Sequence, residues 1–121
     1  MVDFSLTDEQ KMMRDMAREF AAKEMRPLAD KYYRHDQRIP NEELDGLLCK
    51  ANQLRLLDYF YPEEVGGLGM TEDRILGCLI LEEMGWGDAG IAVHLNASIL
   101  AAKAIHAMGT EAQQRKYLNG F

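Results

Sequence analysis

The sequence has few cysteines: its 121 residues include only Cys49 and Cys78, which do not form a CxxC pair. A disulfide-built scaffold and a cysteine-rich zinc site both need more cysteines at closer spacing. Because both residues fall within segments that we expect to be helical, we expect two buried free thiols in a reducing compartment rather than a disulfide.

Basic side chains are fewer than acidic ones. The sequence has 14 Lys and Arg against 20 Asp and Glu, which gives a formal net charge of −6. Nucleic-acid backbones and anionic membrane surfaces attract proteins with basic patches. The acidic excess therefore argues against a nucleic-acid partner and against a membrane partner.

Long apolar runs and targeting signals are lacking as well. No apolar stretch reaches membrane-spanning length without interruption by polar residues. The first residues, Met1-Val2-Asp3-Phe4, lack the basic start and the apolar centre of a secretion signal. We therefore expect an intracellular protein, located in the cytoplasm.

No segment keeps the alternation of apolar and polar residues that marks a half-buried strand, and no internal repeat is present. Apolar residues recur instead at helical spacing, as in the stripe Leu44, Leu47, Leu48 and Ala51. The length is typical of one domain. We expect residues 1–121 to form a single all-α domain, a helical bundle of about five to six helices.

Capping signals predict where these helices begin and end. Pro27 should interrupt or restart the first helix, with a short second helix over residues 28–33. Gly85 should end one apolar helix, with Trp86-Gly87 as a turn, and the very apolar helix over residues 89–108 should be buried on most sides. The start signals are capping boxes at Thr7 and Thr110 and cap residues at Asn41, Thr71 and Asp88.

One stretch departs from the helical pattern for long: residues 62–70, with the sequence PEEVGGLGM. Three glycines within four residues indicate a backbone that needs positive φ or close approach. Their order is neither GxGxxG nor the GK[ST] pattern of phosphate-binding loops. We favour a tight connection between helices over a phosphate site.

Catalytic motifs are equally scarce. His35, His94 and His106 do not have the spacing of a metal site, and we expect His94 and His106 to be satisfied core residues. Adjacent acids such as Glu82 and Glu83 point about 100° apart on a helix, so they do not form an acid–base pair.

Two polar residues lie on the most apolar segment. A buried amide or hydroxyl must find a hydrogen-bond partner, because leaving it without one costs about 1–3 kcal/mol. For Asn96 and Ser98, a bond to a neighbouring helix or backbone and a place in a ligand pocket are both open.

Five motifs occur in order along the chain. In this order and spacing the sequence resembles the N-terminal helical domain of the acyl-CoA dehydrogenase family over essentially its whole length. The PEE-x-GGxG element and the GTE…YL ending are the most specific. The motifs are LTDEQ (6–10), AREFA (17–21), PEEVGGLG (62–69), EEMGWGDAG (82–90) and GTEAQQRKYL (109–118).

The resemblance implies a flavoenzyme. Members of the family oxidise acyl-CoA thioesters to the α,β-enoyl form, with FAD accepting the hydride and a carboxylate base removing the α-proton. Electrons usually pass to an electron-transferring flavoprotein. The middle β domain and the C-terminal helical domain, which hold FAD and supply the base, are absent from this sequence. We therefore expect the isolated chain to retain no FAD and to be inactive.

The resemblance also implies a position for the acyl chain. The helix after Asp88 would supply one wall of the acyl pocket, lined by Ala92, Val93, Asn96 and Leu100. Arg55 departs from the family pattern, because many relatives have a glycine there, where the third helix ends. A glycine would supply a left-handed helix end, so Arg55 makes this turn harder to predict.

Two functions from different classes follow. The first is the N-terminal domain of an FAD-dependent acyl-CoA dehydrogenase, an oxidoreductase of fatty acid metabolism, with part of the acyl pocket on this chain. The alternative is a stand-alone helical interaction or oligomerisation module derived from such an enzyme, without catalysis. Such a module would pair with itself or with the missing domains. A third function is a carrier of apolar ligands that uses the same pocket wall.

Overall fold

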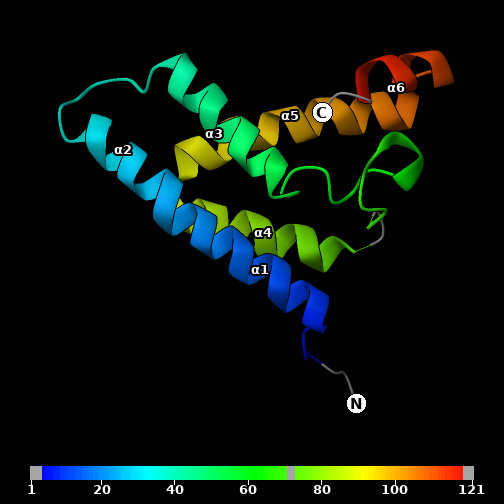
Figure 1. Cartoon of the computed structure of the whole chain (residues 1–121), viewed down its shortest axis with the longest axis horizontal. Helices are drawn as coiled ribbons and strands as arrows, with labels where there is room; N and C mark the ends of the chain where they lie inside the picture. Colours follow the sequence, from blue (N-terminus) through cyan, green and yellow to red (C-terminus); the bar gives the residue numbers. More distant parts are fainter. Residues whose placement is uncertain (1–3, 71–72, 119–121) are drawn as a thin grey trace.

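The computed structural model describes residues 4–70 and 73–118, and this part of the chain consists of helices and irregular connections (Figure 1). It contains no strand, so the all-α prediction is confirmed. In chain order the elements are α1 (Asp8–Phe20), the π-helical segment η1 (Ala21–Met25), α2 (Arg26–Tyr33), α3 (Asn41–Gln53), the 3-10 turn η2 (Glu63–Val65), α4 (Arg74–Gly87), α5 (Ala89–Met108) and α6 (Glu111–Leu118).

The first three elements form one long rod (Figure 1). Pro27 changes the type of helix before it rather than breaking the rod. Within an α-helix its ring would clash with the carbonyl of Lys23, four residues earlier. The wider π-helical turn of η1 precedes Pro27 directly, and we attribute that turn to this clash. The predicted short second helix is present as α2.

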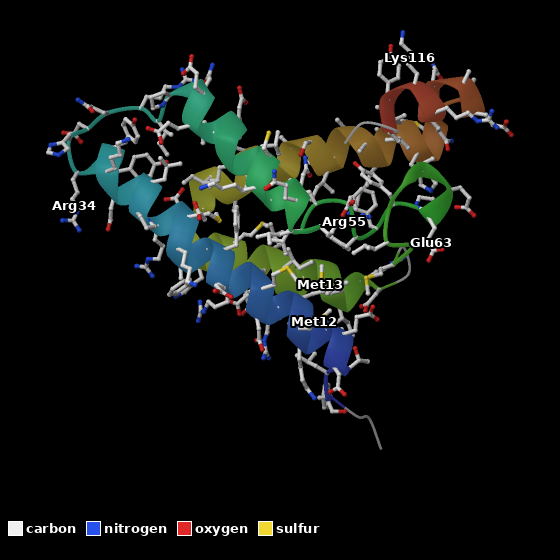
Figure 2. The ribbon with its side chains drawn as sticks, in the orientation of Figure 1. Met12, Met13, Arg34, Arg55, Glu63 and Lys116 are labelled. Atoms are coloured by element: carbon white, nitrogen blue, oxygen red, sulfur yellow. The ribbon has the colours of Figure 1, made fainter. Side chains whose placement is uncertain are left out.

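α4 lies at the centre of the packing. α1 and η1 pack against it, and α5 packs against it as well. Its residues Leu76, Ile80 and Met84 are almost fully buried. Two adjacent methionines of α1 lie on different sides of that helix: Met13 is buried, and Met12 is exposed (Figure 2).

α4 is longer than predicted. It runs through Gly85 and Trp86 and ends at Gly87, so the predicted turn at Trp86-Gly87 is wrong. A Cβ on Gly87 would lie 2.8 Å from the Cβ of Ala21. Gly87 therefore serves close packing between α4 and the long rod, which the local pattern of residues does not reveal.

Most of the predicted helix starts are confirmed. Both capping boxes form, and the Asp88 carboxylate accepts a hydrogen bond from the backbone N–H of Ile91 at 2.8 Å. Asp73 caps α4 by accepting from the N–H of Leu76 at 2.9 Å. Thr71 lies outside the described residues. The prediction for Asn41 is wrong, because Pro40 precedes α3 and no side chain caps it.

The segment after α3 is irregular and yet forms part of the core. Leu56, Leu57, Tyr59, Phe60 and Tyr61 are all buried, with exposures of 0–7%. Turns rather than a strand or helix satisfy their backbone. Periodicity could not find this contribution, because an irregular segment has no repeating spacing.

The glycine-rich loop folds back onto this buried segment. Leu68 donates to the Asp58 carbonyl at 3.3 Å, Gly69 to the Tyr61 carbonyl at 2.7 Å, and Met70 to the Tyr59 carbonyl at 2.9 Å. These bonds occupy the amide groups that a phosphate-binding loop would present to its ligand. The prediction of a tight connection rather than a phosphate site therefore agrees with the geometry.

Exposure differs from the predictions in two places. Cys49 and Cys78 are free but exposed, so the expected burial of both thiols is wrong. The expectation that α5 is buried on most sides is also wrong, because Val93, Leu100 and Met108 are 61–82% exposed.

α5 has a further property. In the described part of the chain it is the one helix that is long and apolar enough to cross a membrane, although only 28% of its apolar window is buried in the structure. Length and composition are weak evidence, because a core helix of a water-soluble protein meets the same criterion. The polar residues that interrupt its apolar run are His94, Asn96, Ser98, Lys103 and His106.

Candidate functional site

The candidate site is an apolar groove of about 300 Å³ between α4, α5 and the buried segment 57–60. Its walls are mostly aliphatic and aromatic, and its polar groups are few. Such a composition is typical of sites that bind the apolar part of a small molecule. The lining residues are Leu57, Tyr59, Phe60, Asp73, Arg74, Gly77, Cys78, Ile80, Leu81, Met84, Asn96, Ile99, Leu100 and Lys103.

Two of the four predicted site residues line this groove. Asn96 and Leu100 lie one helical turn apart on α5, with Asn96 half-buried and Leu100 61% exposed. Ala92 is packed in the core at 3% exposure, and Val93 points outward at 70% exposure. The structure therefore does not bring Ala92 and Val93 into the groove.

The wall of the groove that α4 forms was not predicted from the sequence. Cys78, Leu81 and Met84 line the groove from α4, at the three-residue spacing of one helix face. That spacing was available from the sequence, but it did not show that this face meets α5. Tyr59 reaches the groove from the irregular segment, and no local pattern could have placed it there.

Three charged residues line the groove: Asp73, Arg74 and Lys103. Arg74 and Lys103 are exposed, and the Lys103 ammonium lies 4.7 Å from the centre of the Phe60 ring. The Asp73 carboxylate accepts a hydrogen bond from the backbone N–H of Leu76 at the start of α4. The side-chain amide of Gln10 also donates to both of its oxygens, at 3.0 and 3.1 Å. Gln10 thus joins the start of α1 to the start of α4 and holds one end of the groove.

The tyrosines near the groove are poor acid–base groups. Burial raises the pKa of Tyr59, and the neighbouring Cys78 raises it further. Burial raises the pKa of Tyr61 to about 12, with a smaller contribution from Asp58. Neither hydroxyl loses its proton near neutral pH, so the groove offers surface for binding rather than a base.

The other candidate residues do not form a reactive site. Ser98 donates to the carbonyl of Leu95 at 2.7 Å, which is the local backbone bond that sequence reasoning had left open. His94 is exposed, and His106 is half-buried with no hydrogen-bond partner for its buried Nδ1 atom, so neither is the satisfied core residue that we expected. Among residues 4–70 and 73–118 no group of His, Cys, Asp and Glu side chains could hold a metal ion.

Comparison with known sequences identifies one family. Residues 7–121 match the family described as acyl-CoA dehydrogenase, N-terminal domain. The glutaryl-CoA dehydrogenase of Desulfococcus multivorans is 30% identical over 118 residues, and the short-chain-specific acyl-CoA dehydrogenase of Clostridium acetobutylicum is 34% identical over 119. Each alignment covers 97% of this chain and 29% of the relative.

Comparison with solved structures agrees. Butyryl-CoA dehydrogenase from Megasphaera elsdenii matches with a TM-score of 0.76 and 32% identity. A chain from work on the electron transferring flavoprotein of Acidaminococcus fermentans and flavin-based electron bifurcation matches with a TM-score of 0.79 and 33% identity. Both matches cover 98% of this chain and 30% of the other chain. This chain, which spans less than a third of the length of these relatives, therefore belongs to the acyl-CoA dehydrogenase N-terminal domain family.

Proposed function

We propose that this chain supplies one wall of an acyl-binding pocket in an FAD-dependent acyl-CoA dehydrogenase. The observation that carries the proposal is the apolar groove in which Asn96 and Leu100 of α5 face Cys78 and Leu81 of α4. An acyl chain is an apolar ligand, and burial of each CH₂ group contributes about 0.8 kcal/mol. Ala92 and Val93, which do not line the groove, stay in the proposal only because the family resemblance implies them.

Catalysis would come from elsewhere in such an enzyme. The amide groups of the glycine-rich loop are occupied by internal hydrogen bonds, so the loop does not fit the pyrophosphate of FAD. Tyr59 of the groove and its neighbour Tyr61 do not act as bases near neutral pH, since the pKa of each is raised. FAD, the base and contact with an electron-transferring flavoprotein are therefore assigned to other parts of the enzyme, and the isolated chain should be inactive.

A chimaera tests the pocket wall. Residues 7–118 would replace the matching segment of butyryl-CoA dehydrogenase from Megasphaera elsdenii, and flavin content and acyl-CoA oxidation with a dye acceptor would be measured. In the chimaera, Leu100→Trp should lower kcat/KM about tenfold or more for long acyl chains while sparing short ones, because the indole fills the groove.

The matched control is Ile75→Trp, which adds the same ring to an exposed isoleucine of α4 that does not line the groove. If the flavin-loaded chimaera kept the same ratio of kcat/KM between long and short acyl chains after Leu100→Trp, the pocket assignment would be contradicted. Acyl-CoA oxidation by the purified 121-residue chain alone would contradict the assignment of catalysis to other domains.

The second candidate is a helical interaction module without catalysis. The observation in its favour is the exposure of large apolar side chains on α5, since Val93 is 70% and Met108 82% exposed. Large exposed apolar patches usually mark interaction surfaces. The third candidate, a carrier of apolar ligands, would be supported by calorimetric binding of an acyl-CoA to the isolated chain.

A further inference from the structure

Tyr59 is a buried residue whose hydroxyl group has no hydrogen-bond partner in the described part of the chain. The residue is only 7% exposed, and it lines the apolar groove. Within residues 4–70 and 73–118, no backbone or side-chain group forms a hydrogen bond with this hydroxyl. A buried polar group without a partner costs about 1–3 kcal/mol, so native structures rarely leave one unsatisfied.

The α4 wall of the groove leaves room for this hydroxyl. A Cβ on Gly77 would lie 2.7 Å from the hydroxyl oxygen of Tyr59, which is too close for a real contact. A glycine within a helix costs about 1 kcal/mol relative to alanine. Gly77 and its neighbour Cys78 both line the groove. The hydroxyl therefore lies at the wall of the groove, beside a helix position that is glycine at some cost in stability.

Asn96 brings a second polar group without a partner to the same groove. It is half-buried on α5 and lines the groove. Its side-chain amide forms no hydrogen bond with any residue of the described ranges. Ser98 of the same helix differs, because its hydroxyl donates to the carbonyl of Leu95. Of the two alternatives that the sequence left open for Asn96, the structure favours a place in a ligand pocket.

The two unpaired groups match an uncharged oxygen on a ligand. A tyrosine hydroxyl and a carboxamide can each donate and accept a hydrogen bond, whereas a plain hydrocarbon chain leaves both without a partner. Tyr59 keeps its proton near neutral pH, because its pKa is raised by burial and by Cys78. A carboxylate fits less well, since the carboxylate of Asp73 also lines the groove and burial of an ionised group costs more.

We propose that the groove selects acyl chains that carry an uncharged oxygen, as a hydroxyl or oxo group beyond the β-carbon, and that Tyr59 and Asn96 bind this oxygen. The inference rests on the proposed function, because it takes the acyl chain as the ligand of the groove. Tyr59 is already covered by this chain to all but 7% of its surface. A slender ligand that enters the groove can therefore reach its hydroxyl more easily than the surface of another domain can.

The first test uses the flavin-loaded chimaera described above. The substrates are hydroxyacyl-CoA and oxoacyl-CoA isomers of one chain length, with the oxygen at successive carbons beyond the β-carbon, and the unsubstituted acyl-CoA of that length. Tyr59→Phe removes only the hydroxyl. It should lower kcat/KM for the best oxygenated isomer about tenfold and change that for the unsubstituted chain by less than about twofold. Asn96→Leu should act in the same direction.

The matched control is Tyr61→Phe, which removes a hydroxyl from a buried tyrosine that does not line the groove. It should leave the ratio of the two kcat/KM values unchanged. Equal losses for both kinds of substrate after Tyr59→Phe would assign Tyr59 to folding and overturn the proposal. No change for either substrate would also overturn it, because water or another domain would then satisfy the hydroxyl.

An acyl-CoA with a terminal carboxylate forms the third arm of this test. A preference for it that survives Tyr59→Phe would assign the selectivity to Arg74 and Lys103, which also line the groove, and would overturn the proposal. The response to Leu100→Trp separates the two levels of the argument. A normal response to Leu100→Trp without a response to Tyr59→Phe would contradict only this inference, whereas no response to Leu100→Trp would contradict the pocket assignment.

A second test measures the position of the hydroxyl without any ligand, by urea unfolding of the 121-residue chain. Gly77→Ala should lower the unfolding midpoint, because the added methyl group meets the hydroxyl of Tyr59. In a Tyr59→Phe background the same substitution should cost less, since the oxygen is gone. Equal costs in the two backgrounds would show that the hydroxyl does not lie against Gly77, and the proposal would fall.

Discussion

At the scale of single residues, Gly67 has the least room for a side chain among the described glycines. A Cβ placed there would lie 2.1 Å from the carbonyl oxygen of Tyr61 and 2.3 Å from its Cβ. These atoms belong to backbone and to a fully buried residue, so they cannot move aside easily. The loop therefore needs a glycine at this position for space rather than for unusual dihedral angles.

We predict that Gly67→Ala lowers the free energy of unfolding by about 3 kcal/mol or more, since the clash displaces a buried segment. Gly46→Ala is the matched control, because a Cβ on this α3 glycine meets no atom within 4 Å. It should raise stability by about 0.5–1 kcal/mol. Urea unfolding followed by the fluorescence of Trp86 measures both; equal effects of the two variants would contradict the assignment.

At the scale of elements, α3 ends in a Schellman motif. Leu56 donates to the carbonyl of Ala51 at 3.0 Å, and Arg55 donates to that of Asn52 at 2.9 Å. Arg55 takes the left-handed conformation, with φ of 61°, which costs a residue with a Cβ more than it costs glycine. Its side chain forms an ion pair with Asp58 at 2.6 Å and donates to the carbonyl of Gly66 at 2.6 Å. These contacts offset the strain and join the end of α3 to the glycine-rich loop.

This explanation predicts an order of stability among variants. Arg55→Ala loses both side-chain contacts and keeps the strain, whereas Arg55→Gly loses the contacts and relieves the strain. Arg55→Gly should therefore be more stable than Arg55→Ala by about 1 kcal/mol. Arg34→Ala, which breaks an exposed i,i+4 pair with Asp30, should change stability by less than about 0.5 kcal/mol. Denaturant midpoints that rank Arg55→Gly at or below Arg55→Ala would refute the strain argument.

At the scale of the whole molecule, stability should fall in strong base. The pKa of Tyr61 is about 12 in the folded chain, above the ordinary tyrosine value of about 10 in the unfolded chain. Between these values the folded state holds a proton that the unfolded state has lost. The stabilisation is thus complete below pH 10 and is lost as pH rises through 12, by about 2–3 kcal/mol.

Urea midpoints measured from pH 9 to 12 check this prediction. Tyr61→Phe removes the titrating hydroxyl, so the variant should lose less stability over this range than the parent chain. Parallel curves for the two proteins would show that Tyr61 does not cause the loss.

Most of the helices and their starts were predictable because their causes are local. The capping boxes at Thr7 and Thr110 and the cap at Asp88 depend on neighbours three residues away, and all three are present. The end of α4 was not predictable, because Gly87 is needed for close packing against Ala21, which lies far away in the sequence. Of the groove, Asn96 and Leu100 were found and the α4 wall was not.

By itself, the sequence determined the all-α class, most of the helix starts and the family, because these depend on short-range spacing and on the order of motifs. Only the tertiary structure decided which surfaces are covered. It placed the irregular segment from Leu56 to Tyr61 in the core, left both cysteines exposed and exposed the outer face of α5. Burial depends on which elements meet, and contacts between distant residues leave no periodic signal in the chain.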